Sequence, residues 1–289
     1  MRSKDILNYL DVKTNKVKIL FFDLDGTLLD SNKQISEKCI KYLYHLKNNY
    51  NFRLGIASGR HIPSILNILN QYGIYNLFNA IIANNGADIV LNDNNTTKKL
   101  GCITKNTVKE LINVFCTWEN VTVFFHDENK LYSTKIDNRI LDIKYKNSEE
   151  SILNPAIDFN YHNPSRISLM VEDIEIIEKI KNISFKNLKG YHSEPLIYEY
   201  VYPTVSKSNG IKYYIDLYDW DMQDVMVFGD GNNDVEMLED CGFGICMKNG
   251  EGTAALVANE VTEYTNDEDG IVKFLEKYIK ELSDEKFSL

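Results

Sequence analysis

The sequence lacks the features that mark secreted, membrane-spanning and disulfide-stabilised proteins. No uninterrupted apolar stretch approaches the roughly 20 residues that a helix needs to cross a bilayer, and the N-terminus has no adequate apolar signal segment. We therefore expect a cytoplasmic protein. The five cysteines are odd in number and show no CxxC spacing, so the sequence predicts neither a disulfide framework nor a zinc knuckle.

Positive charge is also in short supply. The chain has 32 Lys and Arg against 42 Asp and Glu, which gives a formal net charge of −10. Nucleic-acid affinity comes largely from Lys and Arg that displace counterions from phosphates, so we expect no nucleic-acid partner, and we also expect no membrane or obligate protein partner. The content of 44% hydrophobic and 26% charged residues is instead that of a folded globular protein with a sizeable core.

Strand and helix patterns alternate in the first third of the chain. The apolar run before Asp23 predicts a buried strand that leads into a loop, and Ser36 is a candidate cap for the helix that follows it. A second short apolar run begins at Phe52, a second helix has Pro63 near its start, and a third apolar run lies around residues 80–87. Such alternation predicts an α/β fold with a Rossmann-like parallel sheet covered by helices.

The pattern changes between residues 103 and 202. A helical pattern is followed by VTVFFHD and KLYST, two strand-like runs separated by turn residues, and then by a strand, a helix over 174–185 and another strand. Paired strands predict an antiparallel sheet, and the alternating pattern returns after Pro203. We therefore expect a core made of residues 1–102 and 203–289, interrupted by an α+β cap of residues 103–202.

Two aspartates at the end of the first predicted strand form the first candidate site. Asp23 and Asp25 flank Leu24, and residues separated by one point to the same side of an extended chain. Facing carboxylates repel unless a cation or a shared proton intervenes, so the pair indicates a hard-cation site, usually for magnesium, with Gly26 and Thr27 adding backbone amides. The alternative is a strand that merely ends in an acidic turn, although FFDLDGTLL is more specific than an isolated DxD.

A second acidic cluster occupies residues 229–238, GDGNNDVEML. It follows an apolar strand and opens a helix, at the edge where parallel sheets bind their ligands. Asp230 would supply another carboxylate to the metal site. Asn233 and Asp234 lie at the helix start, where helix capping is the alternative role.

Two weaker signals concern phosphate. Ser58, in IASGR, follows the second predicted strand, with Gly59 allowing close approach, and a hydroxyl beside a helix N-terminus favours phosphate binding. Lys207, in PTVSKSNG, would add positive charge for a phosphoryl group, although a lone Lys is more often a solvated surface residue.

Taken in order, these segments resemble the four motifs of the haloacid dehalogenase (HAD) superfamily: DLDGT, ASGR, the segment around Lys207, and GDGNND. The inserted module between the second and third motifs is similar to that of the Cof-type subfamily, phosphatases with a large α+β cap of the second class. The resemblance covers essentially the whole chain. It implies the HAD fold and a magnesium-dependent phosphomonoester hydrolase that acts on a small phosphorylated metabolite, with a sugar or polyol phosphate as the expected substrate.

The resemblance also assigns roles to residues. It implies that Asp23 is the nucleophile and that Asp25 is the general acid and base, which needs a pKa raised towards neutrality. The implied phosphate-binding residues are Ser58, Gly59, Lys207, Asn233 and Gly26. The implied metal ligands are Asp23, Asp25 through its backbone carbonyl, Asp230 and Asp234, with Asn233 supporting them.

The chain departs from the subfamily around the third motif. The usual pattern resembles P-x-G-V-S-K-G, and the present segment reads PTVSKS from Pro203 to Ser208. Arg166 and Glu199 of the expected cap match no motif and are expected to be structural. Two rival functions stay open: a phosphotransferase of the phosphomannomutase type, and a phosphate-sensing regulatory protein without turnover, which would normally have lost one of the carboxylates.

Overall fold

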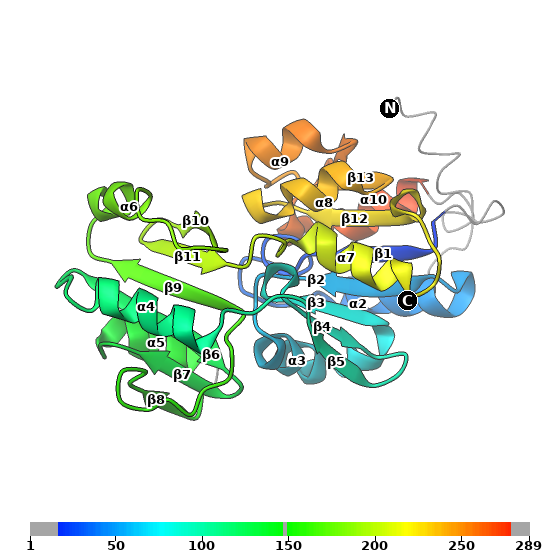
Figure 1. Cartoon of the computed structure of the whole chain (residues 1–289). Helices are drawn as coiled ribbons and strands as arrows, with labels where there is room; N and C mark the ends of the chain where they lie inside the picture. Colours follow the sequence, from blue (N-terminus) through cyan, green and yellow to red (C-terminus); the bar gives the residue numbers. More distant parts are fainter. Residues whose placement is uncertain (1–16, 147–148, 279–289) are drawn as a thin grey trace. The chain divides into compact units, whose positions relative to one another are not determined.

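The computed structural model describes residues 17–146 and 149–278, and they fall into two compact units (Figure 1). The first unit takes the chain up to Arg60, Ile68–Lys98 and the chain from Ser206 onward. The second unit takes His61–Asn67 and Lys99–Val205. Within the described residues, no helix is both long and apolar enough to cross a membrane.

An eight-stranded sheet forms the centre of the first unit, in the order β14-β13-β12-β1-β2-β3-β4-β5. All pairs from β14 to β3 are parallel, and β3 and β4 are antiparallel. The strands are β1 (Ile19–Phe22), β2 (Arg53–Ala57), β3 (Ala80–Ala83), β4 (Asp88–Leu91), β5 (Thr96–Lys99), β12 (Val225–Gly229), β13 (Phe243–Cys246) and β14 (Glu260–Val261). The parallel sheet is as predicted, and a turn of polar residues joins β4 to its neighbour β5.

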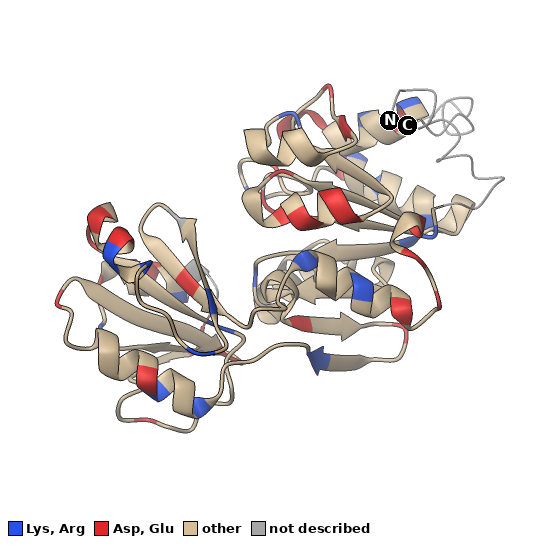
Figure 2. Ribbon diagram, turned by 45° about the horizontal axis from the view of Figure 1, so that its top comes forward, with Lys and Arg blue, Asp and Glu red and all other residues tan. Residues whose placement is uncertain are grey.

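Continuous apolar sequence explains why β1 and β12 occupy the middle of this sheet. Every residue of these two strands is buried, which requires helices on both faces. Neither strand carries a charged residue, and the charged residues of the first unit lie mainly on its helices and loops (Figure 2).

Two helices of the first unit begin at a serine whose side chain caps the helix. Ser36 caps α2, since its Oγ accepts a hydrogen bond from the Cys39 N–H at 3.0 Å, as predicted. The helices are α2 (Glu37–Tyr50), α7 (Lys207–Asp216), α8 (Val235–Asp240), α9 (Gly252–Val257) and α10 (Gly270–Tyr278), while α3 (Ile62–Gln71) begins in the second unit and ends in the first. Single turns of 3-10 helix occupy Tyr75–Leu77, Asn84–Gly86, Met222–Asp224, Asn232–Asp234 and Asn266–Glu268.

A six-stranded sheet forms the second unit, in the order β10-β11-β9-β6-β7-β8. All of its pairs are antiparallel except β7 with β8. The strands are β6 (Val121–Asp127), β7 (Lys130–Ser133), β8 (Ser151–Leu153), β9 (Arg166–Val171), β10 (Lys189–Glu194) and β11 (Ile197–Val201), and the helices are α4 (Lys105–Phe115), α5 (Asn138–Lys146) and α6 (Ile174–Ile180). The antiparallel sheet was predicted, whereas β8, β10 and α5 were not.

Alternation along β6 divides the side chains of the second unit between two cores. Val121, Val123 and Phe125 join the larger core with α4 and α6, whereas Phe124 joins a small core with α5. The helix predicted over 174–185 ends earlier, at Ile180. Asn182 explains this end, because its side-chain amide donates to the Glu178 carbonyl at 2.9 Å.

Candidate functional site

The two acidic segments meet because the strands that precede them are neighbours. Strands β1 and β12 run parallel, and the Asp23 N–H donates to the Phe228 carbonyl at 2.9 Å. Strand β2 flanks β1 on its other side, and Ser58 follows directly after β2. Parallel strands end at a common edge, so Asp23, Ser58 and Asp230 all lie at the carboxyl edge of one sheet.

Three carboxylates converge at this edge. Asp23, Asp230 and Asp234 each offer an oxygen within 4.8 Å of the others. Burial raises the pKa of Asp230 to about 6 and that of Asp23 to about 8, although Lys207 opposes both shifts. Such a cluster of oxygen donors, with Asp23 and Asp234 buried and Asp230 half-buried, fits a hard divalent cation, which would offset the repulsion among the three carboxylates. The residues present therefore fit Mg2+.

Asp234 is wholly buried and organises the loop that carries Asp230. Its Oδ2 accepts hydrogen bonds from the backbone N–H groups of Asp230 and Gly231, both at 2.9 Å. Its Oδ1 accepts from Lys207. Asp234 therefore does more than cap a helix, because it joins the loop to the buried ammonium group.

Lys207 is the first residue of α7 and is buried, not solvated. Its Nζ donates to Asp23 Oδ1 and to Asp234 Oδ1, both at 2.6 Å, and its side chain is 0% exposed. Ser206 caps the helix through the Asn209 N–H at 3.2 Å, which fixes where α7 begins. Burial by itself would lower the pKa of Lys207, but the two carboxylates raise the pKa above its ordinary value.

The Asp25 carboxylate is not one of the three that converge. Arg60 holds it with two hydrogen bonds, from Nε to Oδ2 at 2.6 Å and from Nη2 to Oδ1 at 2.7 Å, and Lys33 Nζ donates to Oδ1 at 2.8 Å. Burial favours a higher pKa for Asp25, but Arg60 and Lys33 together lower its pKa to about 2. The expectation of a raised pKa is therefore wrong for this conformation, because two cations stabilise the carboxylate.

Gly26 and Thr27 fit tightly against Asp230. Gly26 has φ +81°, and a Cβ at this position would lie 2.2 Å from Asp230 Oδ2. Thr27 Oγ1 donates to Asp230 Oδ1 at 2.8 Å. Asn249, which no sequence signal singled out, donates from Nδ2 to the Gly26 carbonyl at 2.7 Å. Gly26 is thus required for close approach of the two loops.

The predicted phosphate-binding residues Ser58, Gly59 and Asn233 lie on loops that contact each other. Ser58 is buried, and its Oγ accepts from the Arg60 N–H at 3.1 Å. A Cβ on Gly59 would lie 3.1 Å from Asn85 Oδ1 and 3.5 Å from Asn233 Nδ2, and these two asparagines are hydrogen-bonded at 3.0 Å. Sequence reasoning missed Asn85, which follows β3 with φ 55°. It also missed Arg60, although this residue stands inside the ASGR segment.

Comparison with known proteins identifies the family. The family model for haloacid dehalogenase-like hydrolases matches residues 20–275. MG265 of Mycoplasma genitalium is 27% identical over 284 residues, which cover 91% of this chain and 99% of that protein. YitU of Bacillus subtilis, a 5-amino-6-(5-phospho-D-ribitylamino)uracil phosphatase, is 25% identical over 278 residues, which cover 91% of this chain and 98% of that protein.

A solved structure has the same fold. A haloacid dehalogenase-like hydrolase from Bacteroides thetaiotaomicron matches with a TM-score of 0.80 at 23% identity, over 90% of this chain and 99% of that one. The likeness confirms the expected parallel-sheet core with an additional α+β cap. The family match spans both units and contains all four motif segments, so the chain belongs to the haloacid dehalogenase-like hydrolases and is a phosphatase of their Cof type.

Proposed function

We propose that this phosphatase hydrolyses the phosphomonoester of a small sugar or polyol through a covalent phosphoryl group on Asp23. The observation that carries the proposal is the buried triad in which Lys207 joins Asp23 to Asp234, with Asp230 beside them. Asp23, Asp230, Asp234 and the backbone carbonyl of Asp25 would hold Mg2+. The ion supplies charge neutralisation for the attacking carboxylate and for the phosphoryl oxygens.

In the first half-reaction, a carboxylate oxygen of Asp23 forms a bond to phosphorus as the bond from phosphorus to the alcohol oxygen breaks. Lys207 fixes the Asp23 carboxylate, and with the amides of the Gly26 and Gly59 loops it stabilises charge on the phosphoryl oxygens. Asp25 gives its proton to the departing oxygen. In the second half-reaction, water gives a proton to Asp25 and attacks phosphorus, which releases inorganic phosphate and restores the Asp23 carboxylate.

Asp25 needs a change of partners to act as an acid. Its pKa of about 2 reflects the ion pairs with Arg60 and Lys33. A phosphate dianion competes for the same cations, because Arg binds phosphate and carboxylate oxygens in similar geometry. Arrival of substrate would therefore draw Arg60 away from Asp25 and raise the pKa of Asp25, which would allow the proton to be carried.

The name of a relative supports the proposed substrate class. The name of YitU describes a phosphate on a ribityl chain, which is a phosphorylated polyol. The net charge of −10 disfavours long polyanionic substrates. We therefore propose a sugar or polyol monophosphate as the substrate for this chain.

The proposal is tested by phosphate release from a panel of sugar, polyol, nucleotide and aryl monophosphates, compared by kcat/KM. We expect the highest values among polyol and sugar phosphates, loss of activity after chelation, and recovery with Mg2+. Full activity with negligible metal content would contradict the metal assignment. A preference for nucleotides would contradict the substrate class, and transfer of phosphate to an added sugar instead of water would favour the phosphotransferase.

A further inference from the structure

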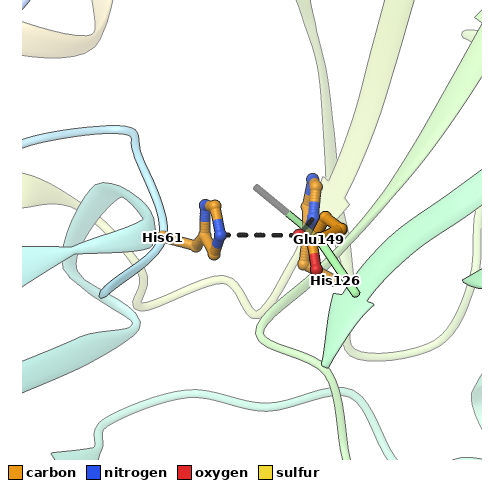
Figure 3. A group of neighbouring side chains, drawn as sticks. All are labelled: His61, His126 and Glu149. Carbon is orange, nitrogen blue, oxygen red and sulfur yellow. Dashed lines mark hydrogen bonds and ion pairs between the residues drawn. The ribbon is translucent and has the colours of Figure 1, made fainter. Parts of the chain in front are cut away.

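A second group of ligating side chains lies in the second unit, where His61, His126 and Glu149 converge (Figure 3). His61 immediately precedes α3, His126 lies in β6, and Glu149 lies between α5 and β8. Glu149 Oε1 lies 2.6 Å from His126 Nδ1 and 3.5 Å from His61 Nε2. Figure 3 shows both imidazoles turned towards the carboxylate.

The three side chains are buried, and burying a carboxylate without a bound cation lowers the stability of the fold. The side chains of His61, His126 and Glu149 are 6%, 11% and 0% exposed. Glu149 Oε2 is buried and has no hydrogen-bond partner within the part of the chain that the structure describes. A buried carboxylate oxygen without a partner loses its hydrogen bonds to water and gains none within the protein, which destabilises the fold.

The protonation states also suit metal binding. Burial lowers the pKa of His126 to about 3, so its imidazole is neutral at pH 7 and keeps a lone pair on one nitrogen. The nearby Arg166, which contributes to that shift, is paired with Glu199 at 3.4 Å. Burial also raises the pKa of Glu149 to about 7, because the buried carboxylate has lost hydration that would stabilise its charged form.

We propose that His61, His126 and Glu149 bind a transition-metal dication of the zinc type, at a site separate from the magnesium site. Two imidazoles and one carboxylate are a common zinc donor set, with a fourth position left for water or another ligand. Magnesium prefers oxygen ligands in an octahedron, so the two sites differ in chemistry.

The three ligand atoms are close enough to share one ion, since all lie within 4.8 Å of one another. With zinc bonds of about 2.0–2.1 Å in a tetrahedron, ligand atoms are about 3.3 Å apart. The His61 to Glu149 distance of 3.5 Å already fits. The His126 to Glu149 distance of 2.6 Å is that of a hydrogen bond, and it would lengthen when the ion replaces the shared proton.

The ion would fasten three segments that are remote in the sequence: the start of α3, strand β6 and the segment before β8. Zinc binding would therefore stabilise the second unit.

The test is a Zn2+ titration of the chelator-stripped full chain by calorimetry, in a large excess of Mg2+ that keeps zinc from the aspartate cluster. We expect one retained equivalent of zinc, and at least about tenfold weaker binding in His126→Gln and Glu149→Gln. His162→Gln is the matched control, because His162 lies in the same unit, is 65% exposed and contacts Asp127. We expect this variant to bind as wild type does, and Asp230→Asn to keep the zinc as well.

Two further measurements keep the proposal testable if a variant folds poorly. Each variant's thermal midpoint with zinc is compared with its own metal-free value, and His61→Gln serves as a third ligand variant. Cobalt bound to wild type should show the strong visible absorption of four-coordinate nitrogen-ligated Co2+. If zinc does not bind in the presence of Mg2+, or if wild type and the ligand variants bind it equally, the three side chains form a hydrogen-bonded cluster and not a metal site. Zinc lost in Asp230→Asn would assign the ion to the aspartates.

Discussion

Asp23 and Asp25 lie two residues apart in environments that push their pKa values in opposite directions. Asp23 is buried beside Asp230 and Asp234, and its pKa is raised to about 8. Asp25 is 37% exposed and held by Arg60 and Lys33, and its pKa is lowered to about 2. Environments that separate the pKa values of two neighbouring carboxylates are typical of sites that give them different roles.

Replacing Asp23 by Asn separates catalysis from stability. The variant loses the proposed nucleophile, so kcat should fall by at least about a thousandfold, or about 4 kcal/mol of activation free energy. Its metal-free form should unfold no more easily than wild type, because Lys207 keeps its ion pair with Asp234 and the repulsion between position 23 and the Asp230 and Asp234 carboxylates is removed. Steady-state kinetics and urea unfolding measure the two effects.

The control for this variant is Asp216→Asn, an exposed aspartate of α7 whose partner is Lys212. It should match wild type in both measurements. Activity of Asp23→Asn within about tenfold of wild type, in a folded sample, would show that Asp23 is not the nucleophile.

Lys207→Met should destabilise the fold as well as abolish activity. Removal of one partner from a buried ion pair typically costs about 3–5 kcal/mol, and here it would leave Asp23 and Asp234 without their ammonium partner. Lys212→Met, on the exposed face of the same helix, should change the free energy of unfolding by less than about 0.5 kcal/mol. Equal urea midpoints for the two variants would refute the structural role of Lys207.

At the scale of elements, the loops that follow β1, β2 and β12 carry the site, and each turns sharply after its strand. The loop after β1 depends on Gly26, whose φ of +81° and contact with Asp230 leave no room for a side chain. Gly73 has a similar φ of +67° but has no atom within 4 Å of an added Cβ. Substitution of Gly73 therefore introduces backbone strain alone, whereas substitution of Gly26 introduces backbone strain and a steric clash.

Gly26→Ala should cost more than Gly73→Ala. The shared left-handed conformation costs about 1–2 kcal/mol for alanine, so Gly73→Ala should lower stability by that amount and leave kcat/KM within about twofold of wild type. Gly26→Ala must also push the Asp230 carboxylate aside, so we expect kcat/KM to fall by more than about tenfold. Thermal unfolding and steady-state kinetics of both variants test this prediction. Similar kcat/KM values for the two variants would contradict the tight fit of Gly26 against Asp230.

Elements defined by local sequence could be predicted, and elements defined by tertiary contacts could not. The apolar runs of β1 and β12 and the Ser36 cap are visible in the sequence, because burial on both faces and capping leave local patterns. The edge strand β10, KGYHSE, has few apolar residues and is a strand only because it pairs with β11. No local sequence pattern predicts this strand.

In the candidate site, too, residues in motif segments could be predicted from the sequence, whereas residues brought in by tertiary contacts could not. The converging aspartates and Lys207 lie in motif segments, and the structure brings them together. The pKa of Asp25 is set by Lys33, from the loop before α2, and by Arg60, from the loop after β2. Lys33 lies in no motif segment, so the sequence does not predict its contact with Asp25. The group of His61, His126 and Glu149 likewise draws on three distant segments, so only the folded chain reveals it.

At the scale of the whole molecule, the motif residues and the inserted module are separate. Asp23, Ser58, Lys207 and Asp230 all belong to the first unit. The second unit carries instead a group of polar side chains around Glu199, which accepts hydrogen bonds from Ser168 at 3.0 Å and Tyr191 at 2.7 Å. We infer that the first unit performs chemistry on the phosphate that all substrates share, and that the second unit distinguishes the alcohols attached to it.

Glu199→Gln tests this division of labour. Glu199 is buried in β11 and also pairs with Arg166 at 3.4 Å, so losing its charge should weaken its contacts with Arg166 and Tyr191 and change the arrangement of polar side chains within the second unit. The measurement is the ratio of kcat/KM for a polyol phosphate to that for a small aryl phosphate, taken on one sample, because the fraction of folded enzyme cancels in this ratio. We expect the ratio to change by about tenfold or more, or about 1.4 kcal/mol, whereas Glu175→Gln, at an exposed position in α6, should leave it unchanged. A loss of activity that is equal for both phosphates would show that Glu199 supports the fold of the second unit and takes no part in selecting the substrate.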